Sequence, residues 1–104
     1  MRFLYIILLL LPLNLVAIDF YELTILEHRF IPDKLYIPKG QKVKLVIINK
    51  DNSVEEFESL DLRREKIIPA QGQITLNVGP LEPGEYEFFG EFNHKTAQGK
   101  IIVE

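Results

Sequence analysis

Short strand-like runs separated by turn residues are the feature that most constrains how this chain can fold. Residues 73–78 read Gln-Ile-Thr-Leu-Asn-Val and alternate polar with apolar side chains, as a strand with one buried face requires. Five further runs are rich in aromatic and β-branched residues: Tyr21–Leu26, Lys34–Ile37, Lys42–Ile48, Tyr86–Phe89 and Lys100–Val103. The pattern predicts an all-β domain.

Proline and glycine divide these runs from one another. In Pro38-Lys39-Gly40 and in Pro83-Gly84-Glu85, a proline with fixed φ precedes a glycine that tolerates positive φ, which is typical of a tight reversal between strands. About seven strands at roughly 8–12-residue spacing indicate a Greek-key β-sandwich. The best candidate for a short helical turn lies within Val54–Arg64.

The chain contains no cysteine and no tryptophan. The absence of cysteine excludes disulfides, thiolate nucleophiles, zinc ribbons and iron–sulfur clusters, and it also excludes the Cys–Trp–Cys pattern of immunoglobulin domains. A domain this small gains little surplus stability from its core alone. We therefore expect either a well-closed hydrophobic sandwich or a metal ion held by oxygen and nitrogen ligands.

Residues 1–17 are predicted to be an export signal. Arg2 precedes an apolar run from Phe3 to Val16, the small residue Ala17 follows it, and 14 of these 17 residues are hydrophobic. The run is shorter than the roughly 20 residues of a membrane-spanning helix. It also contains Pro12 and Asn14. Because Leu15 stands where a cleavage site usually has a small residue, an uncleaved N-terminal membrane anchor is the alternative.

The charge balance argues against a nucleic-acid partner. Twelve Lys and Arg stand against fifteen Asp and Glu, for a formal net charge of −3. Nucleic-acid binding needs a basic face that neutralises phosphates. The one local basic cluster, residues 63–66, is interleaved with acidic residues and is interpreted as a solvated loop.

Three segments resemble the motifs of the cupredoxin superfamily. Phe30–Asn49, with its Phe-Ile-Pro start and Pro-Lys-Gly turn, is similar to the first half of a cupredoxin. Leu81–Phe89 resembles the L-x-P-G-x-Y-x-[FY] strand of that family, and Gly99–Val103 resembles its closing strand. Together they cover nearly the whole chain after the leader. The resemblance implies a Greek-key β-sandwich of the cupredoxin type over residues 18–104.

The resemblance also implies that no blue-copper centre exists here. By position, the first histidine ligand of that centre falls on Glu55, the cysteine on Gly90, the second histidine on Asn93 or His94, and the methionine region on Ala97-Gln98. Blue-copper chemistry needs a thiolate.

A narrower resemblance concerns the loops. The strings at 55–66 and 88–99 resemble the small periplasmic cupredoxin-like proteins that accompany bacterial ferrous-iron permeases. This implies a periplasmic protein that binds iron or copper before uptake, with a membrane permease or another uptake component as partner. Whether the metal is also oxidised stays open. In that subfamily a histidine follows the aromatic residue at Phe92, where this chain has Asn93 and then His94.

The residues themselves also suggest a ligand set. Carboxylates and imidazoles are the metal ligands left to a chain without cysteine, and an oxygen-rich set suits iron or manganese better than copper(I). Candidates gather near one predicted end of the sandwich: Glu55, Glu56, Glu58, Glu91, His28 and His94. Solvated loops are the simpler interpretation of the same acidic residues.

Three classes of function follow. The first is an exported module that binds a transition metal, iron or copper, through Glu55, Glu56, Glu91, His28 and His94. The second is a metal-free β-sandwich that docks a permease or another protein. A hydrolytic enzyme is poorly supported, because Ser53 and Ser59 lack any triad or nucleophile-elbow context. The oligomeric state cannot be read from the sequence.

Overall fold

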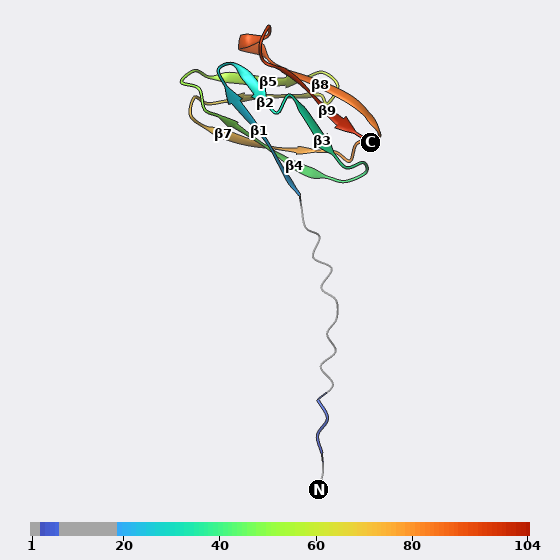
Figure 1. Cartoon of the computed structure of the whole chain (residues 1–104). Helices are drawn as coiled ribbons and strands as arrows, with labels where there is room; N and C mark the ends of the chain where they lie inside the picture. The colour runs from blue at the N-terminus through green and yellow to red at the C-terminus, as the bar shows by residue number, and fades with distance from the viewer. Residues whose placement is uncertain (1–2, 7–18) are drawn as a thin grey trace.

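The computed structural model describes residues 3–6 and 19–104. Most of the predicted export signal therefore lies outside the described residues. Residues 19–104 form nine strands and a single 3₁₀ helix, arranged as two sheets (Figure 1). Within the described part of the chain, no helix is long and apolar enough to cross a membrane.

The first sheet has four strands in the order β2-β1-β4-β7. The strand β1 pairs antiparallel with β2 and parallel with β4, and β4 pairs antiparallel with β7. The bounds are β1 Phe20–Leu26, β2 Arg29–Ile31, β4 Val43–Asn49 and β7 Gln73–Val78.

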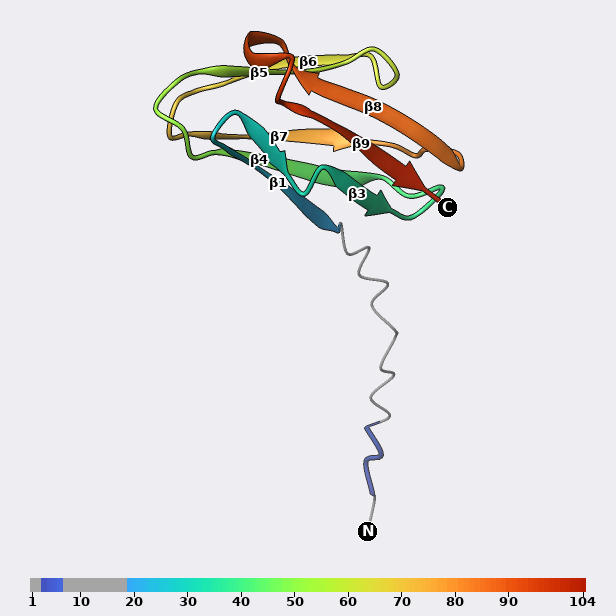
Figure 2. The ribbon, with the colours of Figure 1, turned by 45° about the horizontal axis from the view of Figure 1, so that its top comes forward.

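The second sheet has five strands in the order β3-β9-β8-β5-β6 and lies over the first (Figure 2). Its β3–β9 pair is parallel and its other pairs are antiparallel. The bounds are β3 Lys34–Ile37, β5 Glu55–Ser59, β6 Arg64–Ile68, β8 Gly84–Gly90 and β9 Gln98–Val103, with the 3₁₀ helix η1 at Glu91–Asn93.

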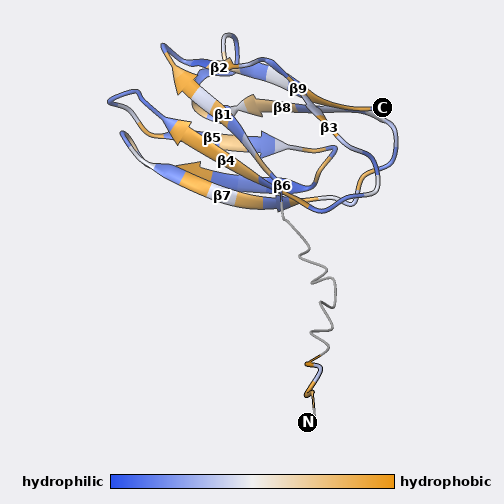
Figure 3. Ribbon diagram, turned by 60° about the horizontal axis from the view of Figure 1, so that its bottom comes forward, coloured by the Kyte–Doolittle hydropathy of each residue, from blue (hydrophilic) through white to orange (hydrophobic). Residues whose placement is uncertain are grey.

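The core lies between the two inner faces. Hydrophobic and hydrophilic residues alternate along β7, as Figure 3 shows, whereas β4 is hydrophobic over most of its length. Three aromatic rings fill the centre: Phe30 meets Phe88 edge-on at 4.9 Å, and Phe57 lies 5.3 Å from Phe88. These rings join β2 of one sheet to β5 and β8 of the other, so they hold the sandwich closed.

The predicted fold class is confirmed, and the short helical turn predicted within Val54–Arg64 is wrong. That segment contains β5 and the start of β6, and the 3₁₀ helix lies instead at Glu91–Asn93. In β5 the inward positions are Glu55, Phe57 and Ser59, all buried. Because two of these three inward residues are polar, the segment lacks the alternation of hydropathy that marks a strand.

Candidate functional site

The position of Glu55 follows from strand pairing. Glu55 is the first residue of β5, and β5 pairs with β8 so that Phe57 lies opposite Gly90, the last residue of β8. The chain after Gly90 turns into η1, next to the start of β5. Glu55 points between the sheets and is only 2% exposed.

Three donors surround the Glu55 carboxylate. Its Oε1 accepts hydrogen bonds from the backbone N–H of Glu56 and of Phe92, both at 2.9 Å. Its Oε2 accepts a hydrogen bond from the Asn93 side-chain amide at 2.7 Å. Among the described residues, the ion pairs are His28–Asp51 and Lys100–Glu85, so no basic side chain pairs with this buried carboxylate. Hydrogen bonds therefore balance its burial.

Gly90 leaves room for the Glu55 carboxylate because it has no side chain. A Cβ atom built at Gly90 would lie 2.7 Å from Cδ of Glu55 and 2.8 Å from Cβ of Ala97. The backbone N–H of Gly90 donates to the Ala97 carbonyl at 2.8 Å, which keeps the two segments together. A side chain at position 90 is thus incompatible with Glu55 as it lies here.

These contacts bring together the positions that the cupredoxin resemblance assigns to metal ligands: Glu55, Gly90, Asn93 and Ala97. They do not fit a copper ion. No sulfur or imidazole is present at them, and both carboxylate oxygens already accept hydrogen bonds from protein donors. The side chain of Glu55 with its three donors is called the Glu55 cluster below.

Glu56 and Glu91 belong to a different surface. Glu56 and Glu58 point outward from β5, and Glu65 of β6 lies opposite Glu58. A hydrogen bond shared with Glu65, burial, and repulsion from Glu65, Glu58 and Glu91 raise the pKa of Glu56 to about 7. Burial and repulsion from Glu91 and Glu65 also raise the pKa of Glu58. These carboxylates crowd one another on the outer face, away from the carboxylate of Glu55.

His28 lies in the turn between β1 and β2. Its backbone N–H donates to Oδ2 of Asp51 at 3.0 Å, and its Nδ1 lies 3.6 Å from the same oxygen. The neighbouring N–H of Glu27 donates to the other carboxylate oxygen of Asp51. The contacts of His28 therefore fasten the β1–β2 turn to the loop after β4.

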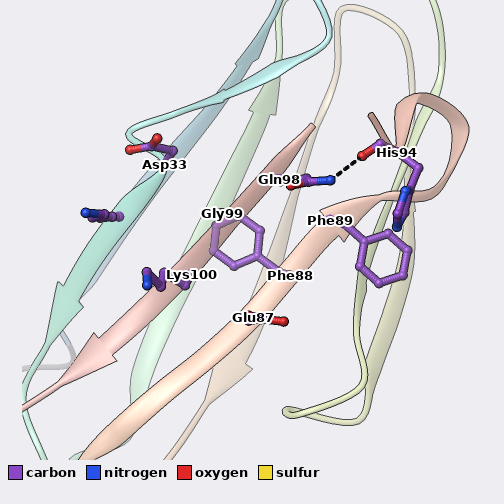
Figure 4. Close-up of a pocket in the computed structure, with 9 residues that line it drawn as sticks. Asp33, Glu87, Phe88, Phe89, His94, Gln98, Gly99 and Lys100 are labelled. Atoms are coloured by element: carbon purple, nitrogen blue, oxygen red, sulfur yellow. Dashed lines mark hydrogen bonds between the residues drawn. The ribbon is translucent and has the colours of Figure 1, made fainter. Parts of the chain in front are cut away.

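His94 follows η1 and packs edge-on against Phe89, with ring centres 4.8 Å apart. Its carbonyl accepts a hydrogen bond from the Gln98 side chain at 2.9 Å. Both side chains line a groove of about 430 Å³ over the outer face of β3, β8 and β9 (Figure 4). Lys34 and Lys100 also line this groove, together with Asp33 and Glu87, so its charge is mixed.

The structure does not gather the predicted ligand set. Within residues 3–6 and 19–104, no group of three or more His, Asp or Glu side chains is placed to hold a metal ion. Glu55 is buried in its own cluster, Glu56 and Glu91 share the acidic outer face, and the histidines have separate partners. The residue that sequence reasoning missed is Asn93 in the role of a donor to Glu55. The available signal was the cupredoxin resemblance, which places both Glu55 and Asn93 at positions of metal ligands.

Comparison with known proteins agrees with the architecture. A family model described as a cupredoxin-like domain matches residues 3–103. A protein of Rickettsia prowazekii (strain Madrid E), named only as uncharacterized, is 49% identical over 82 residues, which cover 79% of this chain and 66% of that protein. The chain thus aligns with about two thirds of the length of that relative.

Solved structures with the same fold include copper proteins. One is the metal-binding domain of the Cu(I)-exporting P-type ATPase CopA of Streptococcus pneumoniae D39, with Cu(I), at TM-score 0.70, 17% identity and 82% and 84% coverage of the two chains. Another is a copper-binding protein in its apo form, at TM-score 0.70, 20% identity and 82% and 86% coverage. A reduced amicyanin variant has TM-score 0.64, 17% identity and 86% and 83% coverage. At these identities the likeness shows the fold.

Proposed function

The chain belongs to the family of cupredoxin-like domains, and from that premise we propose that it is a metal-free binding module of this fold. In this proposal the domain binds a partner protein and does not bind a copper or iron ion. The Glu55 cluster is the observation that carries this proposal, because a carboxylate and its donors take up the place where related domains have metal ligands.

A metal ion at Glu55 would have to displace existing contacts. Coordination by either oxygen would compete with the N–H of Phe92 or with the amide of Asn93, and both are held in place by η1. A buried donor left without an acceptor costs roughly 1–3 kcal/mol. Gly90 offers no ligand atom in return, and a larger residue there would overlap the carboxylate. The cluster therefore favours hydrogen bonding over coordination.

The partner proposed is a membrane permease for ferrous iron, or another component of periplasmic iron uptake. The resemblance of the loops to proteins that accompany such permeases supports this choice, together with the predicted export signal. A permease partner would also account for a cupredoxin-like domain without a redox centre, since docking needs a surface and no electron carrier.

Metal titration tests the proposal. Purified chain is titrated with Cu(I), Cu(II) and Fe(II) under argon against colorimetric chelators, in the wild type and in Glu55→Gln. We expect neither protein to take up a stoichiometric ion. One equivalent bound by the wild type would overturn the metal-free assignment, and its loss in Glu55→Gln would make Glu55 a ligand.

A second experiment addresses the partner. The chain and the ferrous-iron permease of the same organism are co-expressed, cross-linked in intact cells and purified through a tag on the permease. We expect a cross-link that maps to a described residue of the sandwich. Absence of a cross-link, or a cross-link that an unrelated periplasmic β-sandwich forms equally well, would remove the permease from the proposal and leave the metal result standing.

A further inference from the structure

We propose that β7 is a dimerisation edge, at which a second copy of this chain pairs antiparallel with the first around Thr75. The two four-stranded sheets would then form one continuous sheet. The proposal goes beyond the proposed function and does not depend on it, because it rests on the edge of the sheet opposite β2.

The four edge strands of the sandwich differ in how they are protected. Natural sheets guard their edges with short strands, charged side chains and proline. The edge β2 has three residues including Arg29, and Pro32 follows it. The edge β3 has four residues including Lys34, and it lies between Pro32 and Pro38. The edge β6 carries three consecutive charged residues, 64–66.

Within its own six residues, the edge β7 has none of these guards, although the charged side chain of Arg64 from β6 reaches the Asn77 carbonyl near its end. It is six residues long, Gln73–Val78, and it contains no charged residue and no proline. In the described part of the chain its strand partner is β4 alone, and it runs along one margin of the sandwich (Figure 3). Among the four edges, β7 is therefore the one suited to accept another strand.

The direction of its free backbone groups follows from two hydrogen bonds. The Gly72 carbonyl accepts from the N–H of Asn49, so Gly72 faces β4. The Asn77 carbonyl accepts from Nη2 of Arg64 at 2.9 Å, so Asn77 faces away from β4. Because backbone groups alternate along an antiparallel strand, Gln73 and Thr75 also face away. Arg64 touches only one end of this edge, which leaves the groups of Gln73 and Thr75 open.

The strand is complementary to itself. A two-fold axis at Thr75 places it opposite the partner's Thr75, and it places Gln73 opposite the partner's Asn77. The Thr75 pair would exchange two backbone hydrogen bonds, as hydrogen-bonded pairs of antiparallel ladders do. In each Gln73–Asn77 pair, the Asn77 carbonyl already accepts from Arg64 and would receive the Gln73 N–H at its second lone pair. On the outer face, threonine would meet threonine, which is a favourable cross-strand pair, and the amide of Gln73 would meet the amide of the partner's Asn77. On the inner face, Ile74 would meet the partner's Leu76, so the apolar layer would continue across the junction.

Sedimentation velocity of the full chain over a concentration series tests the proposal, with two variants at one position. Thr75→Pro removes an N–H that makes no bond to β4, so it leaves the sheet intact and blocks the edge. Thr75→Val keeps that N–H and the β-branched shape, and it serves as the matched control. We expect dimers for the wild type and Thr75→Val, and a dissociation constant raised at least tenfold for Thr75→Pro.

Hydrogen exchange measured by NMR on the wild type gives a readout without any substitution. The amides of Gln73 and Thr75 should become protected as the protein concentration rises, while those of Ile74 and Leu76 should be protected throughout. A protein that remains monomeric at about 1 mM would overturn the proposal. So would a dimer that Thr75→Pro leaves unchanged, or one in which the Thr75 amide still exchanges freely.

Discussion

Glu55→Ala is the substitution that most directly tests the Glu55 cluster. It removes the acceptor of three hydrogen bonds from donors at 2.9, 2.9 and 2.7 Å. Hydrogen bonds to a charged group contribute about 1.5–3 kcal/mol each, but removing a buried charge also regains part of its desolvation penalty. Water can reach some of the freed donors. We therefore expect a net loss of about 3 kcal/mol in the free energy of unfolding.

The loss is measured by urea and thermal denaturation, with and without a chelator. For a domain of this size, about 3 kcal/mol corresponds to a fall in Tm of roughly 12–24 °C. Glu58→Ala is the matched control, because it deletes the same side chain from the outward face of the same strand. Burial and repulsion from Glu91 and Glu65 raise the pKa of Glu58, so removal of this carboxyl should leave Tm equal to or above that of the wild type.

Two results would refute this reasoning. One is a loss below about 1 kcal/mol in Glu55→Ala, which would mean that its three donors find equally good partners elsewhere. The other is a wild type that the chelator destabilises as much as the substitution does. That outcome would make Glu55 a metal ligand rather than a hydrogen-bond acceptor.

Three further predictions follow from other contacts. Gly90→Ala should lower stability by about 1–3 kcal/mol in urea denaturation, because its Cβ would overlap the Glu55 carboxylate. The Tm of the wild type should fall as pH rises from about 4.5 to about 7, because the folded protein retains a proton on Glu56 that the unfolded chain has released; Glu56→Gln should flatten this dependence in calorimetry. Phe57→Ala, which empties a fully buried site, should cost about 3–5 kcal/mol, and an unchanged denaturation midpoint would contradict the packing described.

Much of the sandwich could be predicted from the sequence, because burial of one face imposes a period of two. Lys34–Ile37 and Gln73–Val78 form strands at the predicted bounds. The strand β2 was missed because its three residues are too few to show a period. The strand β5 was missed because two of its buried residues, Glu55 and Ser59, are polar.

The candidate site was predicted only in part. Sequence reasoning placed Glu55 and His94 among candidate ligands near one end of the sandwich. It could not show that the ring of His94 packs against Phe89 on the outer face. The direction in which a side chain leaves its loop depends on local backbone angles that no periodicity reports.

The sequence alone determined which chemistry is absent and which kind of fold is present. Without cysteine there is no thiolate, and the alternating runs with their turn residues favour a β-sandwich. The tertiary structure decided which groups lie together at the positions that the cupredoxin resemblance assigns to metal ligands. Phe92 and Asn93 stand 37 and 38 positions from Glu55 in the chain, and only the pairing of β5 with β8 brings their donors to its carboxylate. Hydropathy tells which face of a strand is buried, whereas the partner of a buried polar group depends on contacts between distant segments.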